Sequence, residues 1–313
     1  MDKPLVSVIC LCYNHERFVE HAIESVLKQT YSNIELIVVD DASTDGSRDV
    51  IIKASKNYGF RVILNESNLG NCTSFNQGFK QSKGKYLIDL AADDLLDLER
   101  IQTGVNVLEA KGDTYGVHFC DVELISEEGK SLGTQYKRDQ QGNLSEIVPS
   151  GDIYKALVER YIISAPAMMM TRKVLDELGG YDEQLSYEDF DFWVRSSRNY
   201  HYAFTDQVLI RKRILEHSLS SSQFHRNNKH ALSTAKVCDK ILKMNKNKEE
   251  DQALLKRIKY EVKWDLITEN WEAARKLLGM KEKLGSNSLR TLLEKIILIV
   301  KPNWHWIWKI FYK

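Results

Sequence analysis

Pairs of acidic residues stand where two apolar runs near the N-terminus end. Asp40 and Asp41 follow the run IELIVV, and Asp93 and Asp94 follow the run KYLIDLAA. Carboxylates held close together repel one another, and a divalent cation or a donor-rich ligand relieves that repulsion. Because carboxylate oxygens suit hard cations, the pairs predict a site that binds Mg²⁺ or Mn²⁺.

A second interpretation of the acidic pairs is helix capping. The first pair precedes the triplet STD, whose side chains suit the N-terminus of a helix. Capping does not explain the second pair, since Asp97 already supplies a cap for the helix that follows. The metal-site interpretation is therefore the stronger one for Asp93 and Asp94.

The turn after the first apolar run, CYNHERF, contains no glycine. Dinucleotide-binding folds and P-loops need glycines at this turn, so that backbone N–H groups can reach a phosphate. That route to phosphate binding is excluded, and we expect a nucleotide diphosphate that is held through a metal ion instead.

Apolar runs of strand and helix type alternate through the first 110 residues. Buried strands are expected at 5–12, 34–39, 60–64 and 85–90, and helices at 15–28, 45–56, 71–82 and 97–110. The alternation predicts an α/β fold with a mostly parallel, Rossmann-like sheet flanked by helices. Ligands bind beyond the carboxyl ends of parallel strands, and the acidic pairs lie at these ends.

The rest of the chain is less regular. A strand is expected at 117–124, a long surface loop at 126–149, a helix at 152–159, a short strand at 166–170, and helices at 171–178 and 187–199. From about residue 223 the pattern is helical almost to the end, which predicts a helical C-terminal extension.

Five segments together resemble a known enzyme family. They are VSVICLCYN, ELIVVDDASTDGS, NLGNCTSFNQG, GKYLIDLAADD and LGGYDEQLSYEDFDFWVR, in the order that the family has. They are similar to family-2 glycosyltransferases, which have the GT-A fold, use a nucleotide-sugar donor and invert the anomeric centre. The resemblance implies a GT-A domain at 1–220, with a donor half at 1–115 and an acceptor and catalytic half at 116–220, followed by a helical extension at 221–313.

The resemblance implies the donor contacts residue by residue. Asp41 stands where the family binds the nucleotide base, and a carboxylate can accept the uracil N–H, which implies a UDP-sugar. Tyr13 resembles the aromatic residue that stacks on the base, with ordinary packing as the alternative. Asp93 resembles the contact to the ribose or sugar, and Asp94 the metal ligand of the D-x-D-type motif. Asn76 stands at a donor-facing polar position, but it could equally be a helix-surface residue.

Glu188 and Asp189 resemble the acidic motif on the acceptor side of the family's site. The resemblance implies that Asp189 is the general base, which takes the proton of the acceptor hydroxyl as this hydroxyl attacks the anomeric carbon. The alternative is that both acids only favour the start of a helix. Trp193 follows in the same segment, either as a sugar platform on the acceptor side or as a core residue.

Two further residues complete the site that the resemblance implies. His217 loosely matches a position at which a histidine completes the metal shell. The family pattern has an arginine two residues before this histidine, whereas the chain has Leu215 there and Arg213 four residues before. Arg211 or Arg213 is expected to neutralise the donor diphosphate, and Arg213 is included among the donor-binding residues.

Charge is distributed unevenly, although the 313 residues include 44 basic and 44 acidic ones. Residues 1–210 carry 21 basic and 33 acidic residues, and residues 211–313 carry 23 basic and 11 acidic ones. The acidic part argues against a nucleic-acid-binding enzyme, whereas the basic end could meet an anionic surface. The five cysteines show no C-x-x-C spacing, which favours buried thiols in a reducing compartment over a zinc site.

The C-terminal end combines apolar, aromatic and basic residues. Residues 292–300 have the sequence LLEKIILIV, and several tryptophans and lysines follow between Trp304 and Lys313. This composition suits the boundary between water and lipid. We expect either a peripheral contact of 292–313 with the inner membrane surface or a tail packed on protein. The N-terminus resembles no signal peptide and no apolar run is long enough to span a bilayer, which predicts a cytoplasmic enzyme.

The implied function is metal-dependent, inverting transfer of a sugar to a hydroxyl of a glycan or lipid-linked acceptor in surface polysaccharide synthesis. A metal-dependent nucleotidyltransferase is one alternative, but it would usually have a Gly-rich, basic motif after the first strand. A non-catalytic sugar-binding or scaffold relative is another alternative. Such a relative would be expected to have lost Asp94 or Asp189, and both are present.

Overall fold

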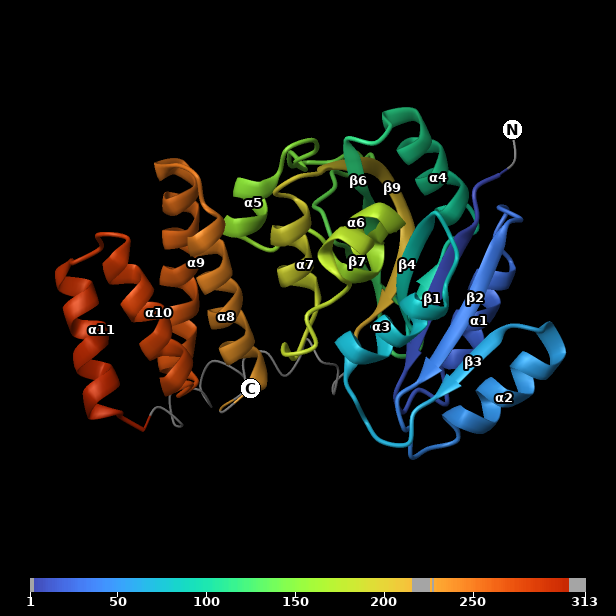
Figure 1. Ribbon diagram of the computed structural model, residues 1–313, viewed down its shortest axis with the longest axis horizontal. Helices are drawn as coiled ribbons and strands as arrows, with labels where there is room; N and C mark the ends of the chain where they lie inside the picture. The colour runs from blue at the N-terminus through green and yellow to red at the C-terminus, as the bar shows by residue number, and fades with distance from the viewer. Residues whose placement is uncertain (1–2, 216–225, 227, 304–313) are drawn as a thin grey trace. The chain divides into compact units, whose positions relative to one another are not determined.

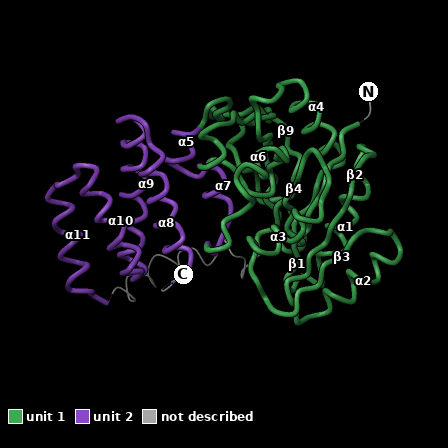
Figure 2. The backbone as a smooth tube through the Cα atoms, viewed as in Figure 1, with its two compact units in different colours: residues 1–153, 162–184, 195–215 green, residues 154–161, 185–194, 216–313 purple. Residues whose placement is uncertain are grey.

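The chain forms two compact units, which Figure 2 shows in different colours. The computed structural model describes residues 3–215, 226 and 228–303. The first unit comprises residues 1–153, 162–184 and 195–215. The second unit comprises residues 154–161, 185–194 and 216–313. The predicted domains 1–220 and 221–313 remain a prediction. The units differ from them in grouping two short segments before residue 195 with the helical extension.

The first unit contains a mixed sheet, which Figure 1 shows as arrows. Its strands in the described part of the chain are β1 (Val6–Cys12), β2 (Ile34–Asp40), β3 (Arg61–Leu64), β4 (Tyr86–Ala91), β5 (Leu95–Leu96), β6 (Tyr115–Ile125), β7 (Ser131–Thr134), β8 (Met168–Thr171) and β9 (His201–Arg213). Their order is β3-β2-β1-β4-β8-β6-β9-β5, and β7 pairs with β6.

Helices accompany the strands of the first unit. They are α1 (Val19–Leu27), α2 (Ser47–Tyr58), α3 (Asn71–Gln81), α4 (Arg100–Lys111) and α6 (Arg172–Leu178), with a 3₁₀ turn η1 at Ala165–Ala167. Each helix of the first half joins two strands, as the alternation of the sequence predicts. The α/β fold class is therefore confirmed.

Strand β1 lies at the centre of the parallel part of the sheet and is buried along its whole length. Val6 pairs with Ile34 of β2 on one side and with Tyr86 of β4 on the other, both in parallel register. On one face, Gly78 of α3 packs so closely that a Cβ there would lie 2.6 Å from Cγ2 of Ile9. Cover on both faces explains why these strands are continuous apolar runs.

The other half of the sheet departs from the parallel arrangement. β8 lies between β4 and β6 and is antiparallel to both of them. β9 then runs parallel to β6, and the two-residue strand β5 pairs antiparallel with the end of β9. The expectation of a mostly parallel sheet is thus correct for β3-β2-β1-β4, and the long strand β9 was not expected from the sequence.

The second unit is built from helices. They are α5 (Tyr154–Glu159), the first six residues of α7 (Asp189–Ser196), α8 (Lys229–Met244), α9 (Lys248–Ile267), α10 (Trp271–Lys283) and α11 (Leu289–Val300). The side chains of Asn228, Asn247 and Ser288 accept hydrogen bonds from N–H groups in the first turns of α8, α9 and α11. These N-caps confirm the predicted helical extension. None of the described helices combines the length and the hydropathy that a bilayer span needs.

Helix α9 buries charged side chains. The guanidinium of Arg257 donates to Glu261 at 3.0 Å and lies 4.0 Å from the ring centroid of Tyr161. Asp265 follows one turn later, is 5% exposed, and its Oδ2 has no hydrogen-bond partner among the residues that the structure describes. Burial, and then the negative charge of Glu261, raise the pKa of Asp265 to about 8.

Substitution of Asp265→Asn is expected to stabilise the protein. Below the unfolded pKa of about 3.9, both states carry the proton and the carboxyl costs nothing. Between about pH 4 and pH 8 the unfolded chain releases the proton while the folded chain keeps it, so the wild type loses stability as pH rises. The gain in melting temperature of Asp265→Asn should therefore grow from pH 5 to pH 8 and then level off.

Differential scanning fluorimetry across this pH range measures the effect. Glu272→Gln is the matched control, because the Glu272 side chain in α10 is 67% exposed and its ion pair within the described chain is with Lys276. A gain for Asp265→Asn that does not change with pH would contradict the raised pKa.

Candidate active site

The pair Asp93-Asp94 lies in the turn that follows β4. Both side chains are buried, with residue exposures of 9% for Asp93 and 3% for Asp94. The backbone N–H of Asp94 donates to the carbonyl of Ala91 at 3.0 Å, which closes the turn. The backbone N–H of Arg213, the last residue of β9, donates to Oδ1 of Asp94 at 2.8 Å. The carboxylate of Asp94 is therefore held in place by a strand that lies 119 residues away in the sequence.

Arg213 also binds this turn through its side chain. Its Nε donates to the carbonyl of Asp93 at 3.2 Å, and its Nη1 donates to the carbonyls of Ser126 and Glu127 at 3.0 and 2.6 Å. The guanidinium lies 4.5 Å from the ring centroid of Phe18. Arg213 thus ties together the ends of β4, β6 and β9, and the described contacts of its side chain are carbonyl groups and an aromatic ring.

The environment of Asp94 fits a cation. Burial, and then the charge of Asp93, raise the pKa of Asp94 well above its usual value, while the N–H of Arg213 acts in the opposite direction. A divalent ion would relieve this cost, since it favours the ionised form of both carboxylates. Across the described residues, no group of three or more His, Cys, Asp and Glu side chains could hold a metal. The predicted further ligand, His217, lies outside the described residues.

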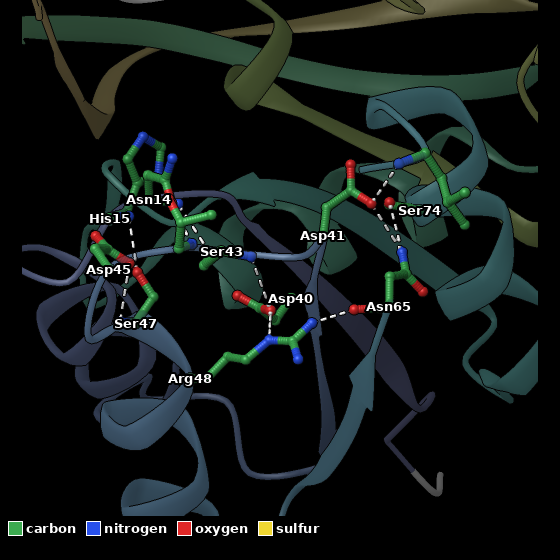
Figure 3. A network of polar contacts seen from close by, with 12 residues as sticks. Asn14, His15, Asp40, Asp41, Ser43, Asp45, Ser47, Arg48, Asn65 and Ser74 are labelled. Carbon is green, nitrogen blue, oxygen red and sulfur yellow. Dashed lines mark hydrogen bonds and ion pairs between the residues drawn. The ribbon is translucent and has the colours of Figure 1, made fainter. Parts of the chain in front are cut away.

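The loops after β1 and β2 are joined by hydrogen bonds that Figure 3 shows. Oγ of Ser43 accepts from the N–H of Asn14 at 2.9 Å. Oδ1 of Asn14 in turn accepts from the backbone N–H of Thr44 at 2.7 Å. Asn14 and Ala42 have φ angles of 59° and 64°, in the left-handed region that alanine rarely adopts. Such backbone strain is typical of functional sites and persists only where neighbours enforce it.

The first acidic pair is engaged within the protein. Oδ1 of Asp40 accepts from Nε of Arg48 at 2.6 Å and from the N–H of Ser43 at 3.2 Å, so this residue holds the start of α2 (Figure 3). Asp40 thus braces the loop before α2 and a side chain of its first turn, but it does not cap the helix, whose N-cap Gly46 makes no side-chain cap bond.

Asp41, the predicted base contact, organises the next loop. Its Oδ1 accepts from Nδ2 of Asn65 at 2.9 Å and from the N–H of Leu69 at 2.8 Å. Its Oδ2 accepts from the N–H of Gly70 at 2.8 Å. A carboxylate oxygen can accept two hydrogen bonds, and the described residues supply one of them to Oδ2. The base contact remains a prediction.

Two residues of the turn after β1 bear on the site. Tyr13 is open to a ligand, and His15 lies beside the acidic pair Asp93-Asp94. Tyr13 is 45% exposed, so its ring is accessible for stacking. Nδ1 of His15 lies 3.9 Å from Oδ1 of Asp93 and has no hydrogen-bond partner in the described chain. His15 was not among the residues predicted from the sequence. Its position next to Asn14, at the end of the central strand, is the signal that could have identified it.

Asn76 of α3 is 5% exposed and is not the surface residue that one alternative proposed. Its Nδ2 donates to the carbonyl of Tyr181 and to Oε1 of Glu183, both at 2.9 Å. Its Oδ1 accepts from the N–H of Tyr181 at 2.9 Å. Both N–H groups of the amide are thus engaged within the protein, and Asn76 anchors the segment that follows α6.

The predicted acceptor-side residues Glu188 and Asp189 belong to the second unit. Asp189 is the first residue of α7, and its Oδ1 accepts from the N–H of Phe190 at 2.6 Å. The carbonyl of Glu188 accepts from the N–H of Phe192 at 3.0 Å, so the two acids form the beginning of the helix. This placement agrees with the helix-start alternative and leaves the catalytic role of Asp189 as a prediction.

The C-terminal extension supports α7 within the second unit. Asp191 is fully buried, and its Oδ1 accepts from Nζ of Lys240 in α8 at 2.6 Å. The guanidinium of Arg257 in α9 lies 4.9 Å from the ring centroid of Phe190. Buried charge–charge and cation–π contacts of this kind restrict how a helix can rotate.

The structure corrects the interpretation of Trp193 as a sugar platform on the acceptor side. The residue is 1% exposed and packs edge-to-face on Tyr161, with 6.0 Å between ring centroids. A ring buried to this degree has no free face on which a sugar could stack, so Trp193 is the core residue of the second interpretation.

Comparison with known proteins gives a family for the chain. The model of the family described as Glycosyl transferase family 2 matches residues 7–179. An uncharacterized glycosyltransferase of Rickettsia prowazekii (strain Madrid E) is 32% identical over 214 residues, which cover 68% of this chain and 64% of that relative. One of Methanocaldococcus jannaschii is 32% identical over 224 residues, which cover 68% of this chain and 72% of that relative. The match thus spans about 64% of the length of the Rickettsia relative.

Solved structures share the fold. TarS of S. aureus (residues 1–349) has a TM-score of 0.67 and 16% identity, with 94% of this chain and 88% of that chain covered. TarS has also been solved with UDP-GlcNAc. The mannosyltransferase PcManGT of Pyrobaculum calidifontis, solved with GDP-Man and Mn²⁺, has a TM-score of 0.59 and 16% identity, with 98% and 84% covered. Together with the arrangement of the acidic turn after β4, these findings make the chain a member of glycosyl transferase family 2.

Proposed function

We propose that this chain transfers a sugar from a nucleotide-diphosphate sugar, with UDP as the expected nucleotide, to an acceptor hydroxyl with inversion at the anomeric carbon. The observation that carries the proposal is the buried pair Asp93-Asp94, whose second member is held by the backbone of Arg213. Membership of the family and the nucleotide-sugar ligands of two similarly folded proteins support a nucleotide-sugar donor.

Most residues that would contact the donor belong to the first unit. Tyr13 would stack on the base and Asp41 would accept its N–H through the remaining acceptor position of Oδ2. Asp93 would contact the ribose or the sugar. Asp94 would hold Mn²⁺ or Mg²⁺, with His217 as a proposed further ligand. A bound metal would supply positive charge that stabilises the departing diphosphate.

Two of the proposed donor-binding residues act mainly by positioning. The guanidinium of Arg213 donates to backbone carbonyls. The amide N–H groups of Asn76 donate to the carbonyl of Tyr181 and to Glu183. Arg213 fixes the acidic turn and contributes a fixed positive charge near the diphosphate. Asn76 fixes the segment after α6.

In the proposed reaction, Asp189 acts as the general base. Its carboxylate takes the proton from the acceptor hydroxyl as the oxygen of that hydroxyl forms a bond to the anomeric carbon. The bond from the anomeric carbon to the phosphate oxygen breaks with its electron pair, and the nucleoside diphosphate leaves. Glu188, next to Asp189, would face the acceptor. No covalent intermediate with the protein is needed, because displacement is direct.

The proposed acceptor is a hydroxyl of a glycan or of a lipid-linked sugar in surface polysaccharide synthesis. The proposed setting is the cytoplasm, with the chain at the inner face of the membrane when the acceptor is lipid-linked. Support for this setting comes from the apolar and basic composition of residues 292–313.

A donor panel tests the proposed function. The full chain is incubated with UDP-sugars and GDP-mannose, with Mn²⁺, with Mg²⁺ and with a chelator, and the released nucleoside diphosphate is measured. We expect metal-dependent release from at least one UDP-sugar. Release of pyrophosphate from a nucleoside triphosphate and a sugar phosphate would indicate a nucleotidyltransferase instead. Binding of a nucleotide sugar without any turnover would indicate a non-catalytic relative.

A further inference from the structure

Helix α11 exposes its apolar side chains. Leu289 and Ile299, near the two ends of the helix, are 74% and 81% exposed. The other exposed apolar residues of the helix are Leu292, Leu293, Ile296 and Val300. Because these positions are spaced by three or four residues, they form one continuous face of the helix. A face of this size on a described helix differs from the scattered apolar residues of an ordinary protein surface.

The two buried side chains of α11 are polar, and its remaining apolar residues, Ile297 and Leu298, are only partly buried. The buried residues are Thr291 and Glu294. Oε1 of Glu294 accepts from Nε of Arg290 at 3.0 Å, and Oε2 of Glu294 pairs with Lys281 of α10, which is fully buried. Oγ1 of Thr291 donates to the carbonyl of Ser286 at 2.9 Å. Helix α11 is therefore inverted relative to a helix that packs on a soluble core, which buries its apolar face.

The ion pair fixes this inverted orientation. Rotation of α11 that buried its apolar face would separate Glu294 from Lys281 and leave the ammonium group buried without its partner. A single buried charge of this kind is strongly unfavourable. The exposed apolar face is thus part of the folded structure of the second unit, and it is available to an occupant outside the described chain.

The charge around the face indicates which occupant fits. From residue 289 to the C-terminus, the sequence has five basic residues and one acidic residue, a balance of +4. Three of the basic residues, Arg290, Lys295 and Lys301, are described in the structure, and Lys295 pairs with Glu282 of α10. The acidic residue is Glu294, whose charge is buried against Lys281. Two copies of the chain that met through this face would bring like charges together, whereas an anionic lipid surface has the opposite charge. Tryptophan and lysine residues at 304–313 also have the composition of interfacial segments.

We propose that the face of α11 formed by Leu289, Leu292, Leu293, Ile296, Ile299 and Val300 inserts into the surface of an anionic lipid bilayer, with the basic residues of the segment 289–313 at the lipid headgroups. The helix lies in the plane of the surface and does not cross the membrane. This inference deepens the membrane setting of the proposed function. It is tested without donor or acceptor. Lipid binding can therefore fail while sugar transfer succeeds, and sugar transfer can fail while lipid binding succeeds.

Vesicle sedimentation of the full chain tests the inference. One set of vesicles contains phosphatidylcholine alone, and the other contains about one third phosphatidylglycerol, a fraction that gives the surface a negative potential. We expect binding to the second set, and weaker binding at high salt. The variant Leu292→Glu/Ile299→Glu should lower binding at least about tenfold, because each residue loses apolar burial and adds a negative charge.

The variant Ile147→Glu/Leu132→Glu is the matched control. It adds the same two charges at positions that are 90% and 57% exposed in the first unit, and it should bind vesicles as the wild type does. Ile299→Glu alone, at the most exposed position of the face, keeps the test valid if the double variant lowers the melting temperature.

Two outcomes would overturn the inference. One is equal vesicle binding by Leu292→Glu/Ile299→Glu and the wild type. The other is a wild-type dimer in light scattering that the variant converts to a monomer, without vesicle binding by either protein. The second outcome would assign the face to a second copy of this chain.

Discussion

Asp189→Asn is expected to reduce the rate of sugar transfer by about 10³-fold, the scale on which a general base contributes. The variant should fold normally, because Oδ1 of asparagine can accept the same hydrogen bond from the N–H of Phe190. Asparagine has no basic oxygen that can take the acceptor proton at neutral pH. Binding of UDP should change little, because the proposed role of Asp189 concerns the acceptor alone.

Transfer assays and calorimetric titration with UDP measure the two effects separately. Glu188→Gln is the neighbouring comparison. It should raise the KM for the acceptor, which Glu188 is proposed to face, and retain most of kcat, since the proposal gives the proton to Asp189. A large loss in Glu188→Gln together with an active Asp189→Asn would reassign the base. Loss of UDP binding in Asp189→Asn would show that the residue serves the donor instead.

Asp94→Asn is expected to lower metal-dependent transfer by at least about 10²-fold, because the site loses the charged oxygen that would hold the cation. The backbone contact should survive, since Oδ1 of asparagine can still accept from the N–H of Arg213. Without metal, the variant should be at least as stable as the wild type. Burial and Asp93 raise the pKa of Asp94, so removal of the carboxyl removes an unfavourable charge.

The rise in melting temperature caused by Mn²⁺ with UDP provides a readout that is independent of activity. This rise should disappear in Asp94→Asn and persist in Asp97→Asn. Asp97 is a nearby acid whose Oδ1 accepts from the N–H of Glu99 at 3.3 Å. An unchanged rise in Asp94→Asn would remove Asp94 from the proposed metal site.

The parallel part of the fold was predictable from local sequence. The strands β1, β2 and β4 are mostly apolar because other elements cover both faces, and the turns after them carry most of the polar residues. The sequence His201–Arg213 is different. It mixes polar and charged residues with apolar ones, and its partners β6 and β5 are distant in the sequence. No local pattern indicates that this segment is a long strand.

The sequence was enough to predict several residues of the candidate site, but not the contacts that these residues make. The position of Asp94 after β4 follows from the pattern of the chain, but its bond to Arg213 depends on the pairing of β9 with β6 and β5. The role of Trp193 could not be decided from the sequence either, because an aromatic residue in an acidic motif suits both a core position and a sugar platform. Its 1% exposure depends on packing against Tyr161, which no spacing in the sequence reveals.

The number of residues in strand β9 determines which face of the sheet carries Arg213. The pairing of β9 is regular between Ile210 and Arg213, which lie opposite Val122 and Ile125 of β6. Because side chains alternate along a strand, loss of one residue within this stretch would turn the arginine to the opposite face of the sheet and away from its three carbonyl partners. Lys212 could not replace it, since a single ammonium group lacks the planar fork of arginine. In natural variation of this chain, insertions and deletions should therefore spare the end of β9 and collect in the exposed loop at 139–147.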